Sequence, residues 1–303
     1  MRKIADAHSD YLAFNTLNES DGRLFDHADI PRMKAGGVSL QTMAVWVPAE
    51  HENAAEAGLE QIRFLNTLVM QYTDVQICTR PEHLTQDHGI NVLLAIESGE
   101  SIGCRTVNIQ KVYDLGARML SLTWNGENEF ASGCMADGGL KPEGRKAIDE
   151  LNCLAMALDV SHLNEQGFWE AVEGYEHKPC ASHSCVYDLC PVPRNLKRNQ
   201  IDKIISQNGF IGVNFYPEFL RNGKVADIGD IIHHIEYILD MGGEDCVGFG
   251  SDFCGIQYTP KGLASIADFQ KLPEEMGRRG FADSLIDKIC YGNFARYVLE
   301  FLH

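Results

Sequence analysis

Histidines and carboxylates follow several short apolar runs of this sequence. The segment Asp-Ala-His-Ser-Asp ends with His8 and Asp10, and Glu97 follows the run Leu-Leu-Ala-Ile. His162 ends Leu-Asp-Val-Ser-His, and His183 ends Cys-Ala-Ser-His. Imidazole nitrogens combined with carboxylate oxygens are ligands typical of zinc or a similar divalent ion. These residues are therefore candidate metal ligands.

The number of candidate metal ligands indicates how many metal ions to expect. A catalytic zinc usually has three protein ligands and one open position, so five candidates are too many for one ion. They suit two metals that share a bridging carboxylate. A single histidine at the end of a strand is usually only a hydrogen-bonded polar side chain, but several at equivalent places are hard to obtain by chance. Asp252, which follows Gly-Phe-Gly-Ser, repeats the pattern once more.

The apolar runs that precede these residues predict strands. Most are continuously apolar, as expected for parallel strands buried on both faces. The predicted strands are Ile4–Ala7, Val38–Val47, Val92–Ile96, Met119–Thr123, Leu158–Val160, Pro179–Ser182, Ile211–Phe215 and Val247–Gly250. Apolar residues at helical spacing lie between them. The predicted helices are Ala54–Tyr72, Thr106–Arg118, Arg145–Ala157, Glu165–Glu173, Ile201–Gln207, Ile228–Asp240 and Ala282–Leu302.

Strands that alternate with helices over this length favour a (β/α)8 TIM barrel, with a doubly wound sheet as the alternative. A barrel places the C-terminal end of every strand on one rim, where its active site is built. The candidate ligands would converge there. The other histidines, at 27, 51, 83, 88, 177, 233, 234 and 303, fall in predicted loops or helices and are interpreted as surface residues.

Composition excludes several classes of protein. The 303 residues carry 26 Lys+Arg and 43 Asp+Glu, a net charge of −17, so a nucleic-acid partner is not expected. No stretch approaches the roughly 18 apolar residues of a membrane span. The N-terminus has no apolar run of signal-peptide length, and the ten cysteines are then expected to be reduced thiols. We expect a single domain over residues 1–303 and a cytoplasmic location.

The motifs together resemble those of a known family. The sequence is similar to the membrane dipeptidase (renal dipeptidase) family, the M19 metallopeptidases, almost from end to end. The resemblance rests on the segments Asp6–Asp10, Ala95–Gly99, Leu158–His162, Ala181–Ser184, Pro193–Asn195, Gly248–Phe253 and Gly292–Phe294. It implies a (β/α)8 TIM barrel of the metal-dependent hydrolase type with two zinc ions.

The resemblance also assigns roles to the ligands. His8 and Asp10 would bind one zinc, His162 and His183 would bind the other, and Glu97 would bridge the two. Such a pair lowers the pKa of a bound water, which would attack the peptide bond as a metal-activated hydroxide.

Two further residues match family positions that act on the substrate. Asp252 corresponds to the catalytic aspartate that moves the proton, and Arg194 to the arginine that holds the substrate carboxylate. Family members hydrolyse dipeptides and often accept a D-residue at the C-terminal position. The resemblance is to soluble bacterial members, without membrane contact, and it points to a homodimer.

The sequence departs from the family pattern at two places. Many members have Leu-Thr-His after the fourth predicted strand, where this chain has Leu-Thr-Trp-Asn. Trp124 and Asn125 are therefore assigned to substrate binding, with an indole in place of an imidazole. Cys254 stands where an aspartate is common, and we interpret it as a buried, inert thiol rather than a ligand.

Three functions remain open at this point. The first is a zinc-dependent dipeptidase. The second is a binuclear metallohydrolase of another small amide, a lactam or an N-acyl amino acid, which Trp124 motivates. The third is a catalytically silent barrel, which is disfavoured because every expected ligand residue is present.

Overall fold

A closed ring of parallel strands forms the centre of the computed structural model, which describes residues 1–17, 25–85, 88–221 and 225–303. The strands are β1 (Ile4–Asp6), β2 (Val38–Val45), β3 (Val75–Ile77), β4 (Ile90–Ile96), β5 (Ala117–Ser121), β6 (Ala157–Asp159), β7 (Cys180–Ala181), β8 (Phe210–Val213) and β9 (Val247–Phe249). All pairings between them are parallel. All eight predicted strand regions are confirmed.

Two pairings close the ring. Strand β1 lies between β2 and β9, and β2 pairs with β4 along Leu40–Val45. The order β2-β1-β9-β8-β7-β6-β5-β4 therefore returns to β2. A doubly wound sheet would end in two free edges, so that alternative is excluded and the (β/α)8 TIM barrel is confirmed.

The strand β3 is an addition that the sequence did not predict. It pairs with Ile90–Val92 of β4, whereas β5 pairs with Leu94–Ile96. Because β2 pairs with Asn91–Ile96 of the same strand, β3 and β5 share the remaining edge of β4, one after the other. Strand β3 therefore lies outside the ring of eight.

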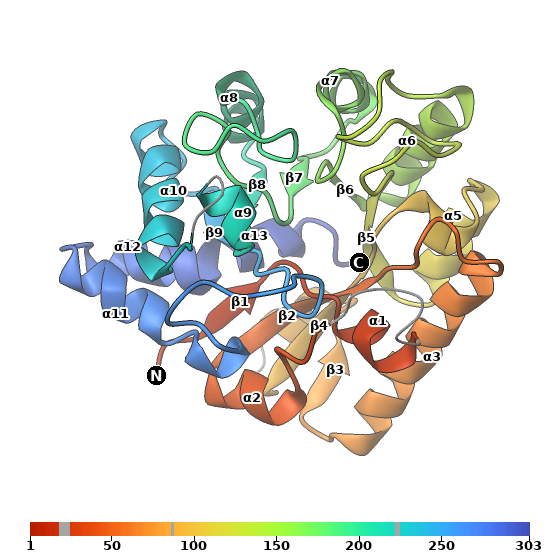
Figure 1. Ribbon diagram of the computed structural model, residues 1–303. Helices are drawn as coiled ribbons and strands as arrows, with labels where there is room; N and C mark the ends of the chain where they lie inside the picture. Colours follow the sequence, from red (N-terminus) through yellow and green to blue (C-terminus); the bar gives the residue numbers. More distant parts are fainter. Residues whose placement is uncertain (18–24, 86–87, 222–224) are drawn as a thin grey trace.

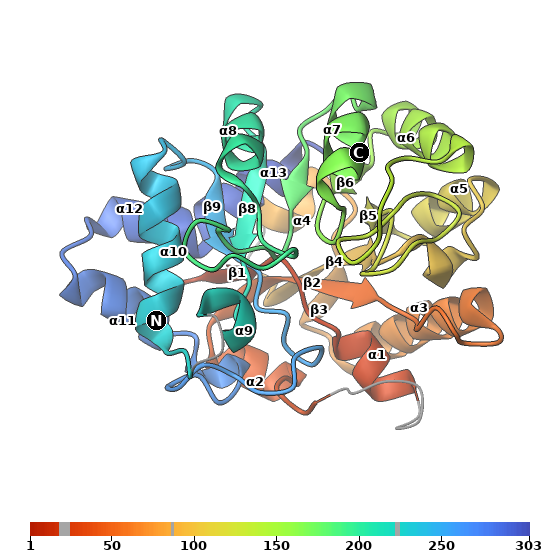
Figure 2. The ribbon, with the colours of Figure 1, turned by 45° about the horizontal axis from the view of Figure 1, so that its top comes forward.

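Helices surround the ring (Figures 1 and 2). The α-helices are α1 (Tyr11–Thr16), α2 (Ile30–Ala35), α3 (Ala54–Gln71), α4 (Pro81–Thr85), α5 (Val107–Asp114), α6 (Pro142–Leu154), α7 (Glu165–Gly174), α8 (Arg198–Ser206), α9 (Pro217–Leu220), α10 (Ile228–Asp240), α11 (Lys271–Arg278), α12 (Asp283–Asp287) and α13 (Asn293–Leu299). Short 3-10 segments are η1 (Gly99–Ile102) and η2 (Ile266–Asp268), and η3 (Lys288–Gly292) is a π-helical turn. The predicted helix at the end of the chain is thus two α-helices joined by this turn.

Helix α13 closes the end of the barrel opposite the polar strand ends. Its Phe294, Tyr297 and Val298 form one buried cluster with inward-facing strand residues such as Ala5 and Phe210. The Tyr297 hydroxyl donates to the carbonyl of Lys178, just before β7. The barrel interior is therefore packed with side chains and capped at its N-terminal end, which leaves the other rim for chemistry.

Two general properties follow from the described residues. The longest helix, α3, has 18 residues, and no described helix combines the length and apolar character that crossing a bilayer requires. All ten cysteines are free thiols, and eight of them are buried or nearly so in the barrel and its helix layer.

His234 is not a surface residue, contrary to the interpretation from sequence. It is 1% exposed on the inner side of α10. Its Nδ1 accepts the backbone N–H of Val186 at 3.0 Å, and its Nε2–H donates to the carbonyl of Leu220 at 3.0 Å. The imidazole therefore ties the loop after β7 to the end of α9, and burial lowers its pKa to about 4.

This environment predicts a contribution of His234 to the pH dependence of stability. Because the pKa of His234 in the folded state lies below the unfolded value near 6.5, the unfolded state takes up a proton first as the pH falls. The contribution of His234 to stability is therefore complete above pH 6.5 and is lost as the pH falls towards 4. Relative to His234→Gln, whose amide does not titrate, the wild type should lose about 3 kcal/mol more between pH 7 and pH 4. Denaturant unfolding at several pH values measures this difference. His233→Gln, on the exposed side of the same helix, should reproduce the wild-type slope, and parallel slopes for wild type and His234→Gln would contradict the assignment.

Candidate metal centre

The rim at the C-terminal ends of the strands gathers all five predicted metal ligands. His8 and Asp10 follow β1, and Glu97 follows β4 directly. His162 follows β6 and His183 follows β7. Each of the five is less than 8% exposed, so the centre is enclosed although it lies at the rim.

The Glu97 carboxylate lies between two groups of side chains. Its Oε2 is 3.1 Å from His8 Nε2. Its Oε1 is 2.9 Å from His162 Nε2 and 3.5 Å from His183 Nε2. One carboxylate oxygen therefore faces the group that contains His8, and the other faces the pair His162 and His183.

The group around His8 also contains two aspartates. His8 Nε2 is 3.7 Å from Asp10 Oδ2 and 4.0 Å from Asp252 Oδ1. On the other side, His162 Nε2 and His183 Nε2 are 2.9 Å apart. Among the described residues, two groups of three side chains could each hold an ion, and His8 belongs to both. One group is His8 with Glu97 and His183, and the other is His8 with Asp10 and Asp252.

These separations fit metal coordination. Ligand atoms about 2.1 Å from a tetrahedral zinc lie about 3.4 Å from one another. The separations between Glu97, His8, His162 and His183 are within roughly half an ångström of that value. The residues present therefore suit a divalent metal in their number, donor type and spacing.

A hydrogen-bond chain fixes the orientation of His183. Asp159 accepts the hydroxyl of Ser182, so Ser182 Oγ in turn accepts Nδ1–H of His183 at 2.7 Å. The backbone N–H groups of Ser161 and Ser182 also donate to Asp159. This arrangement protonates Nδ1 and leaves the lone pair of Nε2 directed at Glu97 and His162, as a metal ligand requires.

Asn125 does the same for His162. Its Oδ1 lies 2.8 Å from His162 Nδ1, which assigns the ring proton to that nitrogen and leaves Nε2 free to bind a metal. The Cys134 thiol donates to the same oxygen. Asn125 also lines the large cavity described below, so its contact with a substrate stays a prediction, but its hydrogen bond orients a candidate ligand.

The electrostatics of His162 and His183 suit metal binding. Burial and the nearby Arg194 charge lower the pKa of His162 to about 4, and burial together with the charges of His8 and Arg194 holds the pKa of His183 well below its usual value. Both are therefore neutral near pH 7, the form that binds metals. Burial would also lower the pKa of His8, but Glu97 and Asp10 outweigh it and raise that pKa well above its usual value.

The carboxylates experience opposite effects. Burial would raise the pKa of Glu97, yet the surrounding histidines hold it well below the usual value, so this group is anionic. Burial and the Glu97 charge raise the pKa of Asp10, and burial raises that of Asp252. Packing three buried carboxylates this closely is unfavourable unless positive charge is supplied, and divalent ions supply it.

Two of the predicted residues have an uncommon backbone conformation. His162 has φ 70° and Asp252 has φ 61°. Side chains other than glycine rarely adopt this left-handed region, and such strain persists where the surrounding structure enforces it. At both positions the chain turns sharply after a strand and directs the side chain back over the rim.

Sequence reasoning missed Asn214, which holds the predicted catalytic aspartate. Its Nδ2 donates to Asp252 Oδ2 at 2.8 Å, so Oδ1, the oxygen nearer to His8, is the one left for chemistry. Asn214 directly follows β8, the same kind of position that identified the ligands, so the strand-end pattern could have found it. Asp6, which joins β1 to Ser251 and to Gln41, gives no such signal because it lies within a strand.

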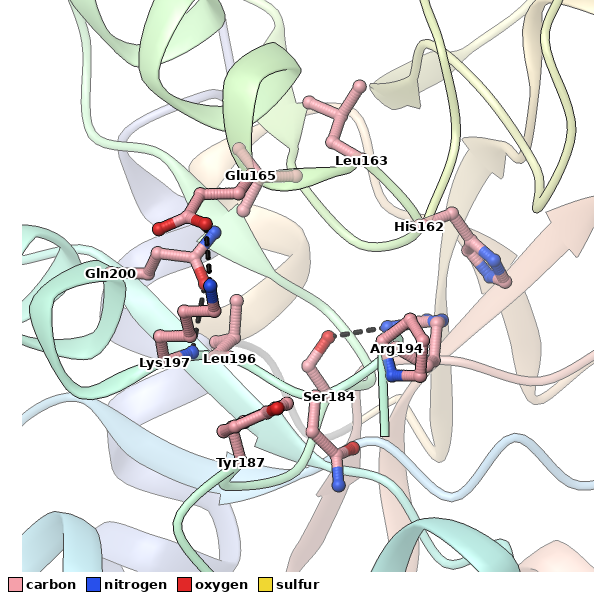
Figure 3. A pocket seen from close by; sticks show the side chains of 12 residues that line it. His162, Leu163, Glu165, Ser184, Tyr187, Arg194, Leu196, Lys197 and Gln200 are labelled. Carbon is pink, nitrogen blue, oxygen red and sulfur yellow. Dashed lines mark hydrogen bonds and ion pairs between the residues drawn. The ribbon is translucent and has the colours of Figure 1, made fainter. Parts of the chain in front are cut away.

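Arg194 lines a small pocket that His162 also borders (Figure 3). It is 6% exposed and donates to Ser184 Oγ at 2.7 Å and to the carbonyl of His183 at 2.8 Å. Its Nε is buried and has no partner within the described part of the chain. The pocket has a volume of about 50 Å³, and an ion pair of Lys197 with Glu165 stands at its edge.

A larger cavity of about 390 Å³ opens over the metal-ligand cluster. It is lined by Asp10, Trp46, Pro48, Glu50, Glu97, Trp124, Asn125, His162, Tyr216, Phe219, Asp252, Gly255, Ile256 and Gln257. Both Trp124 and Asn125 are therefore at the site. Cys254 is fully buried, and burial raises the pKa of its thiol to about 12, in agreement with an inert side chain.

A (β/α)8 barrel with buried histidines and carboxylates at its C-terminal rim defines the class of metal-dependent hydrolases. The model of the membrane dipeptidase family, peptidase family M19, matches residues 2–301. The chain belongs to this family.

Individual relatives agree with this placement. An uncharacterized protein encoded 5′ of pqqA in Klebsiella pneumoniae is 32% identical over 71% of this chain and 83% of its own length. A metallopeptidase of Rhodobacter sphaeroides, solved with a phosphinate mimic of L-Ala-D-Ala, has a TM-score of 0.91 and 26% identity over 100% of this chain and 99% of its own. A solved dipeptidase of family M19 has a TM-score of 0.92 and 26% identity over 99% of both chains.

The cluster leads to a prediction at Gly255. A β-carbon at this position would lie 2.1 Å from Asp10 Oδ2 and 3.1 Å from Asp252 Oδ1, so Gly255→Ala must displace the Asp10 carboxylate. We expect metal binding to weaken about 10- to 100-fold. Metal content after dialysis against a weak chelator, measured by mass spectrometry, tests this. Gly277→Ala on α11, where no heavy atom lies within 4 Å, is the matched control, and equal metal retention in both variants would contradict the prediction.

Proposed function

We propose that this chain is a binuclear zinc dipeptidase that hydrolyses the peptide bond of a dipeptide. The observation that carries the proposal is the position of Glu97, whose two oxygens face two separate groups of nitrogen and oxygen donors. Membership of the M19 family supports the activity. The Rhodobacter sphaeroides relative bound to a mimic of L-Ala-D-Ala supports a substrate with a C-terminal D-residue.

The ligands divide between two zinc ions. His8 and Asp10 would hold one ion, His162 and His183 would hold the other, and Glu97 would supply a carboxylate oxygen to each. Zinc fits the mixed imidazole and carboxylate set, and the orientation of His162 and His183 through their Nδ1 atoms supports it. When bound, the two ions lower the pKa of a water molecule and polarise the scissile carbonyl.

Asp252 moves the proton in this proposal. Asn214 holds its Oδ2, and Oδ1 faces the reacting centre. Burial raises the pKa of Asp252, which favours acceptance of a proton from the attacking water and its delivery to the leaving amine.

Arg194 binds the C-terminal carboxylate of the substrate. Its planar guanidinium binds two oxygens at once, and its buried, unpartnered Nε supplies one donor. A carboxylate held at this distance from the metals restricts the enzyme to short substrates. Trp124 and Asn125 border the substrate on the other side of His162.

In this proposal the chain is a single domain over residues 1–303. It acts on small molecules, as a homodimer in the cytoplasm. The ten free cysteines support a reducing compartment.

A second candidate function keeps the metals and changes the bond. Trp124 stands where many family members have a histidine, and an indole has one N–H donor and cannot become cationic. This favours another small amide, a lactam or an N-acyl amino acid as the substrate.

The deciding experiment is release of amino acids from a dipeptide panel by the zinc-loaded protein. Dipeptides with L- and D-residues at the C-terminal position should be hydrolysed, and a chelator should abolish the reaction. N-acylated and amidated forms of the same dipeptides should be poor substrates. Preference for a blocked terminus would favour the second candidate, and turnover unaffected by the chelator would contradict both.

Asp252→Asn separates catalysis from metal binding. We expect a fall in kcat of at least about 10²-fold with unchanged zinc content, because the amide cannot accept the proton. Turnover and zinc content measured on one preparation test this. Asp149→Asn, on the exposed side of α6, controls for the loss of one negative charge, and full activity of Asp252→Asn would refute the role of Asp252.

A further inference from the structure

The large cavity has two chemically different walls. One wall is the metal-ligand cluster, with Asp10, Glu97, His162 and Asp252. The second wall, called the aromatic wall, is apolar and mostly aromatic, and it consists of Trp46, Pro48, Trp124, Tyr216, Phe219 and Ile256. The carboxylates and histidines serve the reaction, whereas nothing in that chemistry requires the aromatic wall.

Trp46 and Trp124 form the part of this wall beside His162. Their rings meet edge to face with centroids 5.4 Å apart, and the Trp124 ring is 6.3 Å from that of His162. Trp46 is 9% exposed and supports Trp124, which is 40% exposed. The structure thus holds a large apolar ring in the cavity beside a metal ligand, where a bound side chain would cover it.

The charges of the lining select against some side chains. Its charged members are Asp10, Glu50, Glu97 and Asp252, and no described lysine or arginine lines the cavity. An acidic substrate side chain would find no lysine or arginine to pair with there. Glu50 is on the exposed loop after β2, and the other three carboxylates of the lining belong to the metal-ligand cluster.

The position of Arg194 sets the direction of the substrate, and this step rests on the proposed function. The small pocket beside Arg194 (Figure 3) has a volume of about 50 Å³, against about 390 Å³ for the large cavity, and His162 lines both. With the C-terminal carboxylate at Arg194, the N-terminal residue extends into the large cavity. The C-terminal residue has little room.

We infer that Trp46 and Trp124 bind the side chain of the N-terminal residue and make the enzyme selective for dipeptides that begin with an aromatic residue and end with a small one. An aromatic ring stacks on the exposed Trp124 face and removes both surfaces from water.

The test compares two dipeptides of the same composition. For the zinc-loaded wild type, kcat/KM for Phe-Ala should exceed that for Ala-Phe at least about tenfold. Trp124→Ala should lower kcat/KM for Phe-Ala about tenfold, mainly through KM, and should lower kcat/KM for Ala-Ala by a smaller factor, because a methyl side chain covers little of the indole. Equal values for Phe-Ala and Ala-Phe, a preference for Lys-Ala over Phe-Ala, or an equal loss for both substrates in Trp124→Ala would overturn the inference.

Two further measurements complete the design. Met135→Ala is the control, because Met135 is 73% exposed on the neighbouring loop and does not line the cavity, and it should keep the wild-type preference. Binding of a phosphinate analogue of Phe-Ala to Asp252→Asn should quench tryptophan fluorescence, and Trp124→Ala in that background should reduce the change. A wild type that hydrolyses no dipeptide contradicts the proposed function, whereas hydrolysis without the preference contradicts only this inference.

Discussion

One buried carboxylate, that of Glu97, is the interaction on which the rest of the centre depends. Burying a negative charge is unfavourable, and the cost is offset here by contacts with three imidazoles that come from β1, β6 and β7. Those strands lie far apart in the sequence and become neighbours of Glu97 only because the ring of strands closes. The fold and the centre therefore depend on each other. Closure of the barrel brings the cluster together, and the cluster joins loops on opposite sides of the barrel.

A second set of hydrogen bonds gives the cluster its chemical state. Asn125 and Ser182 fix which nitrogen of His162 and His183 carries the proton, and Asn214 fixes which oxygen of Asp252 remains available. None of these three residues carries a charge. They add orientation without adding to the repulsion among the carboxylates, which is why amides and hydroxyls suit these positions.

The barrel and the ligand positions were predictable from sequence because both depend on local patterns, namely apolar runs and the polar residues that end them. Strand β3 was not predictable from sequence, since its three residues give no clear pattern and it adds to an edge of β4 that β5 leaves free. The burial of His234 was not, because its two partners belong to distant loops. The position of Arg194 relative to the two cavities also depends on how the loops pack, and the spacing of residues in the sequence does not predict that packing. The type of a residue indicates the chemistry it can perform, but only its tertiary contacts determine which of its atoms is available for that chemistry.

The pairing of β1 with β9 has a consequence for the order in which the molecule is made. The ribosome releases β1 roughly 240 residues before its edge partner at Val247–Phe249. Until then β1 presents an unpaired edge, and His8 and Asp10 lie far from Asp252. Helix α13, which caps the barrel, arrives later still. Capture of metal is thus a late event of biogenesis, and a prematurely terminated chain has neither a closed barrel nor a complete site.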